Sequence, residues 1–309
     1  MARLIVAVIS WNTRELTRDC LKSVMSEVAE LEHEIWVVDN NSSDGSSKMI
    51  REEFPDVTLI ENNENVGFAR ANNQILRKAR GEYCLLLNSD TVVPPGSIRS
   101  LCRFLDEHPE AGAAGPRLHN GRGSVEPPLK PLPTVAGEWR YCLAYHSGPL
   151  NSLFRHILRH RQVDWRSIKE PTQSEVLSAA CLLIRQKVID DVGVLAEDYF
   201  LFSEENDYFT RMRKAGYHGY YLPQVEMVHL LGMSRKKRGS FDSEANFLRS
   251  RLLYFRKFYP RRAGFVKMTY YFFFIWSSAW SRFSRLIRPH CESDSVALYN
   301  RLLEVLKAG

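Results

Sequence analysis

The chain has 309 residues, of which 44% are hydrophobic and 25% are charged, and its formal net charge at pH 7 is +6. This length is enough for one large α/β domain or two smaller ones, and the composition excludes an intrinsically disordered chain. The mildly basic balance suits an anionic substrate, an anionic membrane surface or only a solvated face. Because no nucleic-acid-binding motif accompanies it, we expect no nucleic-acid partner.

The cysteines and the N-terminus both point to a reducing compartment. Six cysteines are scattered along the chain without a C-x-x-C pair, and several fall on apolar faces, so we expect buried free thiols. The apolar run at 3–10 is too short for the core of a signal peptide and has no small-residue cleavage site after it. The sequence therefore predicts a cytoplasmic protein.

Strand and helix patterns alternate over about the first 115 residues. Four apolar runs predict strands, and a helical pattern separates each run from the next. The predicted strands are 4–10, 33–40, 56–62 and 83–90. Asn12 and Glu15 have the spacing of a capping box for the first helix, and Gly81 suits the C-terminal cap of a helix over 67–80. The rhythm predicts an α/β fold with a mostly parallel, doubly wound sheet and helices on both faces.

Polar side chains stand at the C-terminal end of each predicted strand or directly after it. These are Asn12, then Asp39, Asn40 and Asn41, then Asn62 and Asn63, and finally Asn88, Ser89 and Asp90. Any one cluster is typical of a turn. Ligands of such sheets, however, bind beyond the carboxyl ends of the strands, so the four clusters together indicate a ligand site at one sheet edge.

The rest of the chain breaks this rhythm twice. Residues 120–172 are proline-rich and then basic and amphipathic, which we interpret as an insertion over the edge of the sheet. Strand and helix patterns return at 174–193, and 198–217 predicts an apolar strand, an acidic turn and a helix that ends at Gly216.

The last part of the chain, 241–309, is helical, aromatic and basic. Its segment from Ala263 to Trp280 is nearly long enough to span a bilayer, but Lys267 interrupts it. Flanking arginines and lysines favour a segment that lies at a membrane interface. The alternatives are a helix packed on the main domain and a full transmembrane span.

Seven motifs occur in order along the chain: VVDNNSSDGS, NVGFARANNQ, LLLNSDTVVPPG, GAAGPRL, AACLLIR, FLFSEENDYFTRMRKAGY and VHLLGMS. Together they resemble glycosyltransferase family 2, inverting enzymes with the GT-A fold, and in particular its bacterial rhamnosyltransferase-like branch. The resemblance covers about residues 3–260. It implies a GT-A catalytic domain at 1–240, with the 120–172 insertion facing the acceptor, and a membrane-interface segment at 241–309.

The resemblance also implies a divalent cation, Mg²⁺ or Mn²⁺, beside the diphosphate of the donor. The family's D-x-D metal motif stands here as Asn88-Ser89-Asp90, so that an amide replaces the first carboxylate. Asp90 is then a metal ligand, since hard cations prefer oxygen. His229 matches a family histidine that ligates the metal or touches the diphosphate.

Further residues match the family's nucleotide-sugar site. Asp39 takes the place of the residue that accepts a hydrogen bond from N3–H of uracil or thymine. Asp44 shapes the adjoining loop, and Arg70 is placed to meet a phosphate. The implied set of donor-binding residues is Asn12, Asp39, Asn41, Asp44, Asn65, Gly67, Arg70, Asn88 and Ser89.

The acidic turn holds the catalytic base in this resemblance. The family pattern aligns with Glu204, Glu205, Asn206 and Asp207, which gives Glu205 the base position with one extra methylene. Glu204 and Asp207 are rivals for the role. Three acids in four residues are also typical of a helix N-terminus, where the dipole favours them.

The implied function is metal-dependent transfer of a sugar, such as rhamnose, from a dTDP- or UDP-linked donor to a hydroxyl of a glycan or lipid-linked glycan. Bacterial surface polysaccharide synthesis on the inner face of the cytoplasmic membrane fits this activity. A non-catalytic nucleotide-sugar-binding protein is the alternative, because Asn88 and Glu205 depart from the family pattern. A nucleotidyltransferase or NAD-binding protein is disfavoured, because no G-x-G-x-x-G follows the first strand.

Overall fold

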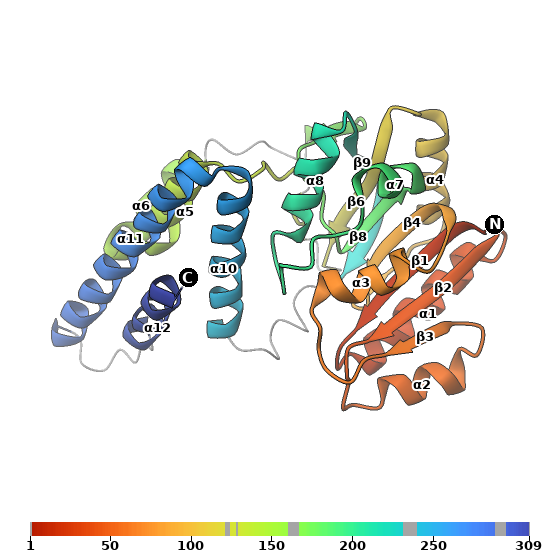
Figure 1. Ribbon diagram of the computed structural model, residues 1–309, viewed down its shortest axis with the longest axis horizontal. Coiled ribbons are helices and arrows are strands. Elements are labelled where there is room, and N and C mark those ends of the chain that lie inside the picture. The colour runs from red at the N-terminus through yellow and green to blue at the C-terminus, as the bar shows by residue number, and fades with distance from the viewer. Residues whose placement is uncertain are drawn as a thin grey trace. The chain divides into compact units, whose positions relative to one another are not determined.

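The computed structural model describes residues 2–120, 124–127, 129–159, 167–230, 240–287 and 295–308. The chain forms two compact units (Figure 1). Unit 1 comprises residues 1–132 and 165–238, and unit 2 comprises residues 133–164 and 239–309. Five cysteines are buried free thiols, as predicted, whereas Cys291 lies outside the described residues.

The first half of unit 1 is a parallel sheet with helical connections. Its strands are β1 (Ala2–Ser10), β2 (His33–Asp39), β3 (Thr58–Glu61) and β4 (Gly81–Asn88). They pair in the order β3-β2-β1-β4, all in parallel. The connecting helices are α1 (Arg14–Val28), α2 (Ser46–Glu53) and α3 (Phe68–Leu76). This arrangement confirms the predicted parallel sheet.

The second half of unit 1 extends the same sheet with mixed directions. Its strands are β5 (Thr91–Val92), β6 (Ala111–His119), β7 (Thr172–Ser174), β8 (Cys181–Arg185) and β9 (His218–His229). Strand β8 runs antiparallel between β4 and β6, β9 pairs in parallel with β6, and β5 and β7 pair antiparallel with β9. The helices here are α4 (Ser97–Glu107), α7 (Gln186–Val192) and α8 (Glu204–Lys214).

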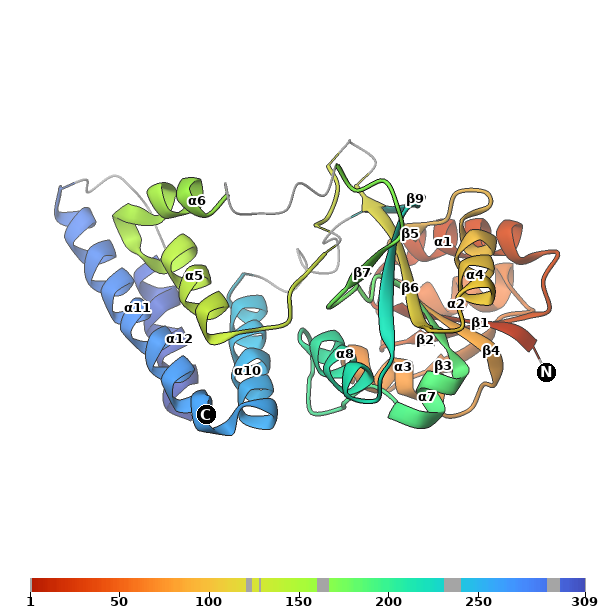
Figure 2. The ribbon, with the colours of Figure 1, turned by 90° about the horizontal axis from the view of Figure 1, so that it is seen from above.

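Helices cover both faces of the sheet, as predicted. Successive residues of a strand point to opposite faces, and in the central strands both sets of residues are apolar. In β1, Leu4, Val6 and Val8 pack with α1, α2 and α4, whereas Ile5 and Ala7 pack with α3, α7 and α8. Figure 2 shows these two helical layers on opposite sides of the strands. Continuous apolar runs are typical of such two-sided burial.

Three local predictions were wrong. Helix α1 has Thr13, not Asn12, as its N-cap, and no side chain caps it. Gly81 does not cap α3, which ends at Leu76, but is the first residue of β4. Residues 199–202 form no strand: residue 199 is irregular and 200–203 form bends, since Phe202 has a positive φ of 69° that no strand accommodates.

Unit 2 is a helical assembly drawn from two separate parts of the chain. Its elements are α5 (Val135–His146), the 3₁₀ helix η1 (Gly148–Leu150), α6 (Asn151–Arg159), α10 (Ser240–Phe258), α11 (Pro260–Ile287) and α12 (Ser295–Ala308). The Tyr270 hydroxyl donates to Glu138 at 2.5 Å, and Arg251 Nε lies 3.4 Å from the same carboxylate. Much of the segment that the sequence places in an insertion over the sheet therefore packs with the C-terminal helices. Of the helices described, none has both the length and the hydropathy that crossing a bilayer requires.

Candidate active site

The polar residues that follow the predicted strands lie at one edge of the sheet in unit 1. The strand register sets Ser10 opposite Asp39 and Ile9 opposite Asn88. At the other side of this edge, β5 pairs with β9 so that Thr91 is opposite His229. The carboxyl end of the parallel sheet is where α/β folds bind ligands, so the register supports a single candidate site there.

Asp39 presents one unused carboxylate oxygen at this edge. Its side chain is only 2% exposed, and its Oδ2 accepts a hydrogen bond from the Ser42 amide at 2.9 Å. Its Oδ1 is buried and has no hydrogen-bond partner among the residues that the structure describes. An orphaned buried acceptor is costly, so Asp39 Oδ1 is poised to accept a hydrogen bond from a ligand.

The neighbouring polar residues hold the loop after β2. Asn12 accepts a hydrogen bond from the Ser43 amide at 2.7 Å. The two oxygens of Asp44 accept from the Arg14 amide at 2.9 Å and from the Ser46 hydroxyl at 2.5 Å. Asn12 and Asn41 both have positive φ, at 54° and 63°. These contacts fix the backbone around Asp39.

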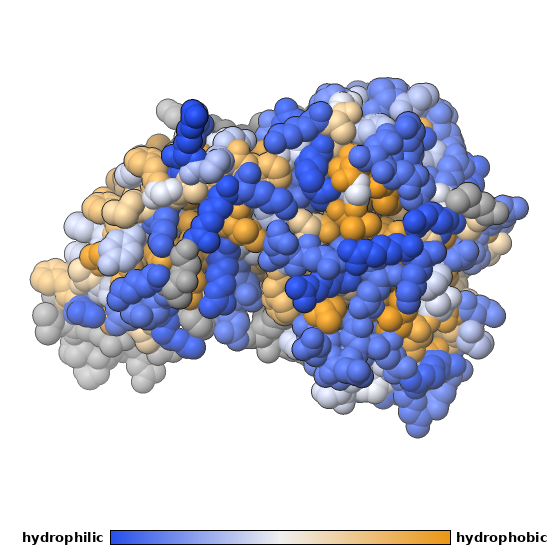
Figure 3. All heavy atoms as spheres, viewed as in Figure 1, coloured by the Kyte–Doolittle hydropathy of each residue, from blue (hydrophilic) through white to orange (hydrophobic). Residues whose placement is uncertain are grey.

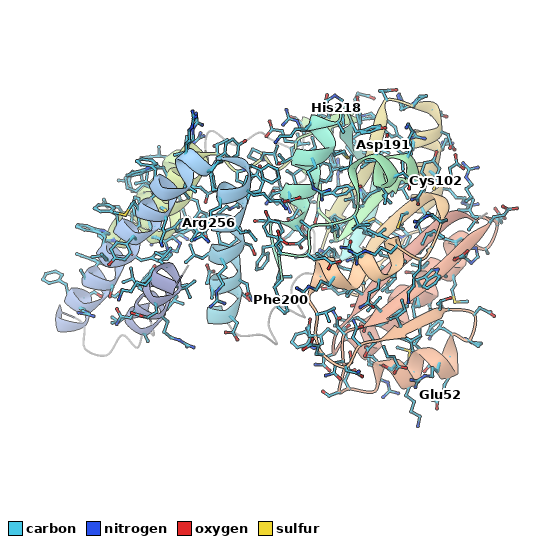
Figure 4. The ribbon with its side chains drawn as sticks, viewed as in Figure 1. Glu52, Cys102, Asp191, Phe200, His218 and Arg256 are labelled. Carbon is cyan, nitrogen blue, oxygen red and sulfur yellow. The ribbon has the colours of Figure 1, made fainter. Side chains whose placement is uncertain are left out.

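Gly67 allows the loop before α8 to approach the start of α3. Its φ is 86°, and a Cβ at this position would lie 2.5 Å from the Phe200 carbonyl oxygen. The Phe68 amide donates to that same oxygen at 3.2 Å, and Asn65 Oδ1 accepts from the Gly67 amide at 3.0 Å. Figure 4 labels Phe200 on this loop. Arg70, in the first turn of α3, is exposed to solvent.

A second polar link ties this contact to the sheet edge. Asn40 Nδ2 donates to the Gly67 carbonyl at 3.3 Å, while Asn40 Oδ1 accepts from Asn62 Nδ2 at 2.9 Å. The strand exits after β2 and β3 are thereby joined to the loop that leads into α8. The loop that leads into the acidic first turn of α8 is thus positioned next to the amides that flank Asp39.

His229 lies between two carboxylates. Its Nε2 is 3.2 Å from Asp90 Oδ1 and 3.4 Å from Asn88 Nδ2, and its Nδ1 contacts Glu126. Burial lowers the pKa of His229, but hydrogen bonds and charge from Asp90 and Glu126 outweigh it and raise the pKa to about 9. The remaining motif residues, 231–234, lie outside the described residues.

Glu126 is a site residue that the sequence did not identify. It sits in the proline-rich segment, where no periodicity marks it, and is held by a hydrogen bond from its own amide to the Leu118 carbonyl at 2.9 Å. The one available signal is a lone acid directly before a proline, which restricts the backbone at that position.

Ser89 serves the packing beneath the site. Its hydroxyl lies 2.9 Å from the Thr13 hydroxyl, and Thr13 in turn lies within hydrogen-bond distance of Thr17 at 3.2 Å. All three side chains are buried. The structure therefore places Ser89 in a hydroxyl cluster that joins the exit of β4 to α1.

The three acids in the first turn of α8 have different surroundings. Asp207 is fully buried and accepts from Arg211 Nε at 2.6 Å, while the Tyr199 hydroxyl lies 3.4 Å from its other oxygen. Glu204 is 5% exposed, and its buried Oε2 has no hydrogen-bond partner in the described part of the chain. Burial and the charge of Glu205 raise the pKa of Glu204 well above its usual range. Glu205 itself is half-buried.

The bend that leads into α8, directly before these acids, has an uncommon backbone. Phe202 and Ser203 have φ values of 69° and 64°, a conformation that residues other than glycine rarely adopt. Such conformations persist where surrounding structure over-determines them, and they concentrate at functional sites. In the part of the chain that the structure describes, no three His, Cys, Asp or Glu side chains are arranged to hold a metal by themselves.

Comparisons with known proteins agree on one family and one fold. Residues 5–193 match the sequence model described as Glycosyl transferase family 2. Over 208 residues the chain is 28% identical to the N-acetylglucosaminyl-diphospho-decaprenol L-rhamnosyltransferase of Mycobacterium tuberculosis. That alignment covers 63% of this chain and 66% of the relative, just under two thirds of the relative's length.

Two solved structures have a similar fold. One is a mannosyltransferase from Pyrobaculum calidifontis in complex with GDP-Man and Mn²⁺, with a TM-score of 0.57, 16% identity and coverage of 99% of this chain and 84% of that one. The other is GalNAc-T7 with UDP, GalNAc and Mn²⁺, with a TM-score of 0.56, 14% identity and coverage of 74% and 44%. At these identities the likeness establishes the fold, which is GT-A.

Proposed function

The chain belongs to glycosyl transferase family 2, and we propose that it transfers a sugar from a nucleoside diphosphate to an acceptor hydroxyl with inversion at the anomeric carbon. The observation that carries this proposal is the buried, unpartnered Asp39 Oδ1 at the same sheet edge as the Asp90–His229 pair. This edge of the sheet thus offers a hydrogen-bond acceptor for the nucleotide base. Separately, it offers groups suited to a metal-bound diphosphate.

The donor in this proposal carries uracil or thymine, so it is UDP- or dTDP-linked. Both bases present an N3–H donor, which would satisfy the orphaned Asp39 oxygen. A rhamnosyl donor is the first candidate, since the M. tuberculosis relative is named as an L-rhamnosyltransferase. Its name also supports a lipid-linked glycan as the acceptor.

The residues at this edge fit a divalent cation, Mg²⁺ or Mn²⁺. Asp90 offers carboxylate oxygens and His229 offers Nε2, and the contact from Glu126 to His229 Nδ1 is the kind of outer carboxylate that orients a metal-bound imidazole. Asp90 and His229 would supply two ligands to the cation, and the diphosphate and water would supply the others. When bound, the cation supplies positive charge that stabilises the leaving diphosphate. The two solved structures named above contain Mn²⁺.

Glu205 is the base in this proposal. The acceptor oxygen attacks the anomeric carbon, the bond to the diphosphate breaks, and the hydroxyl proton passes to a carboxylate. Asp207 is committed to Arg211, and the raised pKa of Glu204 favours its protonated form. That leaves half-buried Glu205 as the acid best able both to reach an acceptor and to take its proton. Neighbouring carboxyls in different surroundings commonly divide their roles in this way.

Unit 2 is the membrane-contacting part in this proposal. Helix α11 carries exposed apolar side chains at helical spacing, which we call the α11 apolar face: Phe265, Met268, Phe272, Ile275, Trp276 and Phe283. Figure 3 shows pale and orange side chains over the helices of unit 2. Arg261, Lys267 and Arg282 lie on the same helix. Such a face with basic flanks supports docking on an anionic, inner membrane surface.

The proposed activity is tested with a donor panel and a transfer assay. The full chain with Mn²⁺ is offered dTDP-rhamnose, UDP-N-acetylglucosamine and GDP-mannose, and thermal unfolding is recorded for each. A true donor raises the unfolding temperature by mass action, and GDP-mannose serves as the control base. Release of nucleoside diphosphate on adding a lipid-linked acceptor supports catalysis. Stabilisation by a donor with neither transfer nor hydrolysis would instead favour the non-catalytic nucleotide-sugar-binding protein.

A further inference from the structure

Unit 2 contains an open pocket of about 770 Å³ that the proposed transfer reaction does not use. Trp139 and Arg140 of α5, Leu158 of α6, and Arg262 and Phe265 of α11 line it. Three helices from two separate parts of the chain therefore contribute to it. Its lining combines aromatic rings and guanidinium groups.

The apolar wall of the pocket is formed by two rings that contact each other. The Trp139 and Phe265 ring centroids are 6.2 Å apart and tilted by 35°, yet Trp139 is 36% and Phe265 is 55% exposed. The Trp139 ring also packs edge-on against Phe273 at 5.4 Å, which holds it in place. Large rings held in position but left in water favour an apolar ligand.

The charged side of the pocket is positive and uncompensated. Arg140 and Arg262 are both exposed, and within the described residues neither pairs with a carboxylate. Arg140 Nε donates to the Ala136 carbonyl of its own helix at 3.2 Å, which leaves its terminal nitrogens available. The nearby acid on α5, Glu138, is buried and already contacts Tyr270 and Arg251. Guanidinium forks match the geometry of phosphate oxygens.

We propose that this pocket binds the phosphate headgroup of a lipid whose apolar chain lies along the α11 apolar face. Phe265 belongs to both the pocket wall and that face, so the two surfaces are continuous. Arg140 and Arg262 hold the phosphate, and Trp139 and Phe265 contact the first carbons of the chain. This proposal rests on the proposed membrane-facing role of unit 2, but its ligand can be tested without a membrane.

The first experiment uses soluble probes and the full chain. Octyl phosphate, octanol and inorganic phosphate are titrated by calorimetry, because only octyl phosphate carries both parts of the proposed ligand. We expect octyl phosphate to bind at least about tenfold more tightly than either other probe. The variant Arg140→Gln/Arg262→Gln should weaken it at least about tenfold, since hydrogen bonds to charged groups are lost.

The matched control is Arg155→Gln/Arg249→Gln, which removes two exposed arginines of unit 2 outside the pocket. It should bind octyl phosphate like the parent chain. The proposed lipid-phosphate site would be contradicted if the control variant lost as much affinity for octyl phosphate as the pocket variant. Equal affinity of the parent chain for octyl phosphate and inorganic phosphate would also contradict it. If the double variant does not fold, Arg262→Lys keeps the charge without the fork and should still weaken binding.

A vesicle arm separates this proposal from membrane docking itself. Neutral vesicles are compared with vesicles containing phosphatidylglycerol or phosphatidic acid at equal total charge. We expect a preference for the phosphate monoester of phosphatidic acid that the pocket variant loses and the control keeps. Equal binding to both anionic lipids by all three proteins contradicts the pocket while docking stands. Octyl phosphate binding without any vesicle binding contradicts docking while the pocket stands.

Discussion

Asp90 Oδ1 and His229 Nε2 lie 3.2 Å apart because the two-residue strand β5, directly after Asp90, pairs antiparallel with the end of β9. The contact is reinforced by a hydrogen bond from the Leu230 amide to the Asp90 carbonyl at 2.9 Å. Asp90 is therefore held at a fixed distance from an imidazole by backbone pairing. The pair is pre-organised, which is what a metal–diphosphate site requires.

The first prediction concerns this pair. Asp90→Asn should abolish Mn²⁺-dependent donor binding while the protein remains folded, because an amide is a weaker ligand than a carboxylate. Glu126→Gln should keep donor binding but weaken Mn²⁺ affinity by roughly 10- to 100-fold, the usual effect of losing an outer-shell partner. Mn²⁺ titration followed by calorimetry measures both. Asp56→Asn, in a turn, is the control, and full transfer by Asp90→Asn in excess chelator would contradict the metal role.

The second prediction is a pH dependence of stability in the metal-free protein. The pKa of His229 is about 9 in the folded state and about 6.5 in the unfolded chain, so the protonated imidazole stabilises the fold. This stabilisation is complete below pH 6.5 and is lost as pH rises to about 9. It amounts to about 3 kcal/mol at most. Urea unfolding with chelator, at steps from pH 6 to pH 10, measures it, and Glu126→Gln should flatten the dependence.

The third prediction distinguishes the roles of the three acids in the first turn of α8. Glu205→Gln should lower the transfer rate by roughly 10²- to 10⁴-fold and leave donor affinity unchanged, because the donor does not need the base. Asp207→Asn should instead lower the free energy of unfolding by about 3 kcal/mol, because it leaves Arg211 without its partner. Rates and donor affinities are measured side by side with Glu204→Gln. Near-native transfer by Glu205→Gln would move the role to Glu204.

The fourth prediction concerns the close contact between the loop before α8 and the start of α3. Gly67→Ala would place a Cβ 2.5 Å from the Phe200 carbonyl, so the loop before α8 must shift and transfer should fall. Gly45→Ala is the control for a positive φ, since φ of Gly45 is 82° but a Cβ there has nothing within 4 Å. Gly45→Ala should lose about 1 kcal/mol of stability, because ψ of Gly45 is 16° and the residue is left-handed helical. Gly67→Ala should lose more, because ψ of Gly67 is 179°, in a region that is essentially restricted to glycine. Only Gly67→Ala should lose transfer activity as well, and equal activities would show that the approach is irrelevant.

The fifth prediction concerns the α11 apolar face. The full chain should sediment with anionic vesicles at low salt and be released by high salt, since each nearby basic residue adds about 1 kcal/mol of screened attraction. Phe272→Ser/Ile275→Ser should weaken sedimentation even at low salt. Tyr145→Ser, an exposed aromatic on α5, is the comparison. Failure of the parent chain to sediment at low salt would leave α11 as a packing helix.

Much of the sheet was predictable because burial on both faces leaves a strong pattern. The predicted strands 4–10 and 83–90 correspond to β1 and β4, whose residues 4–9 and 83–87 are apolar without interruption. Strand β1 ends at Ser10 as predicted, and β4 ends at Asn88, two residues before the predicted end. The ends of helices were less predictable. Asparagine is a residue type that is favoured at N-caps. The Oδ1 of Asn12, however, accepts a hydrogen bond from the Ser43 amide, a partner that only the fold brings near.

The rest of the site could not be predicted because it depends on contacts between distant segments. Glu126 is marked by no periodicity and reaches His229 only through the bridge between His119 and Val125. Glu204, Glu205 and Asp207 look alike in sequence, and only burial and the ion pair to Arg211 distinguish them. Likewise, α5 is buried against α11 by Glu138 and Tyr270, a pairing that local sequence does not encode.

The Glu138–Tyr270–Arg251 contact has a consequence for how this chain can change in evolution. Burial raises the pKa of Glu138, and its two partners lie in α10 and α11, a hundred residues and more along the chain. A premature stop after residue 238 would remove both partners together with α11, against which α5 packs, and would leave the apolar side chains of α5 uncovered. Recombination between relatives faces the same constraint. An exchange of the C-terminal helices succeeds only if the segment at 133–164 is inherited with them.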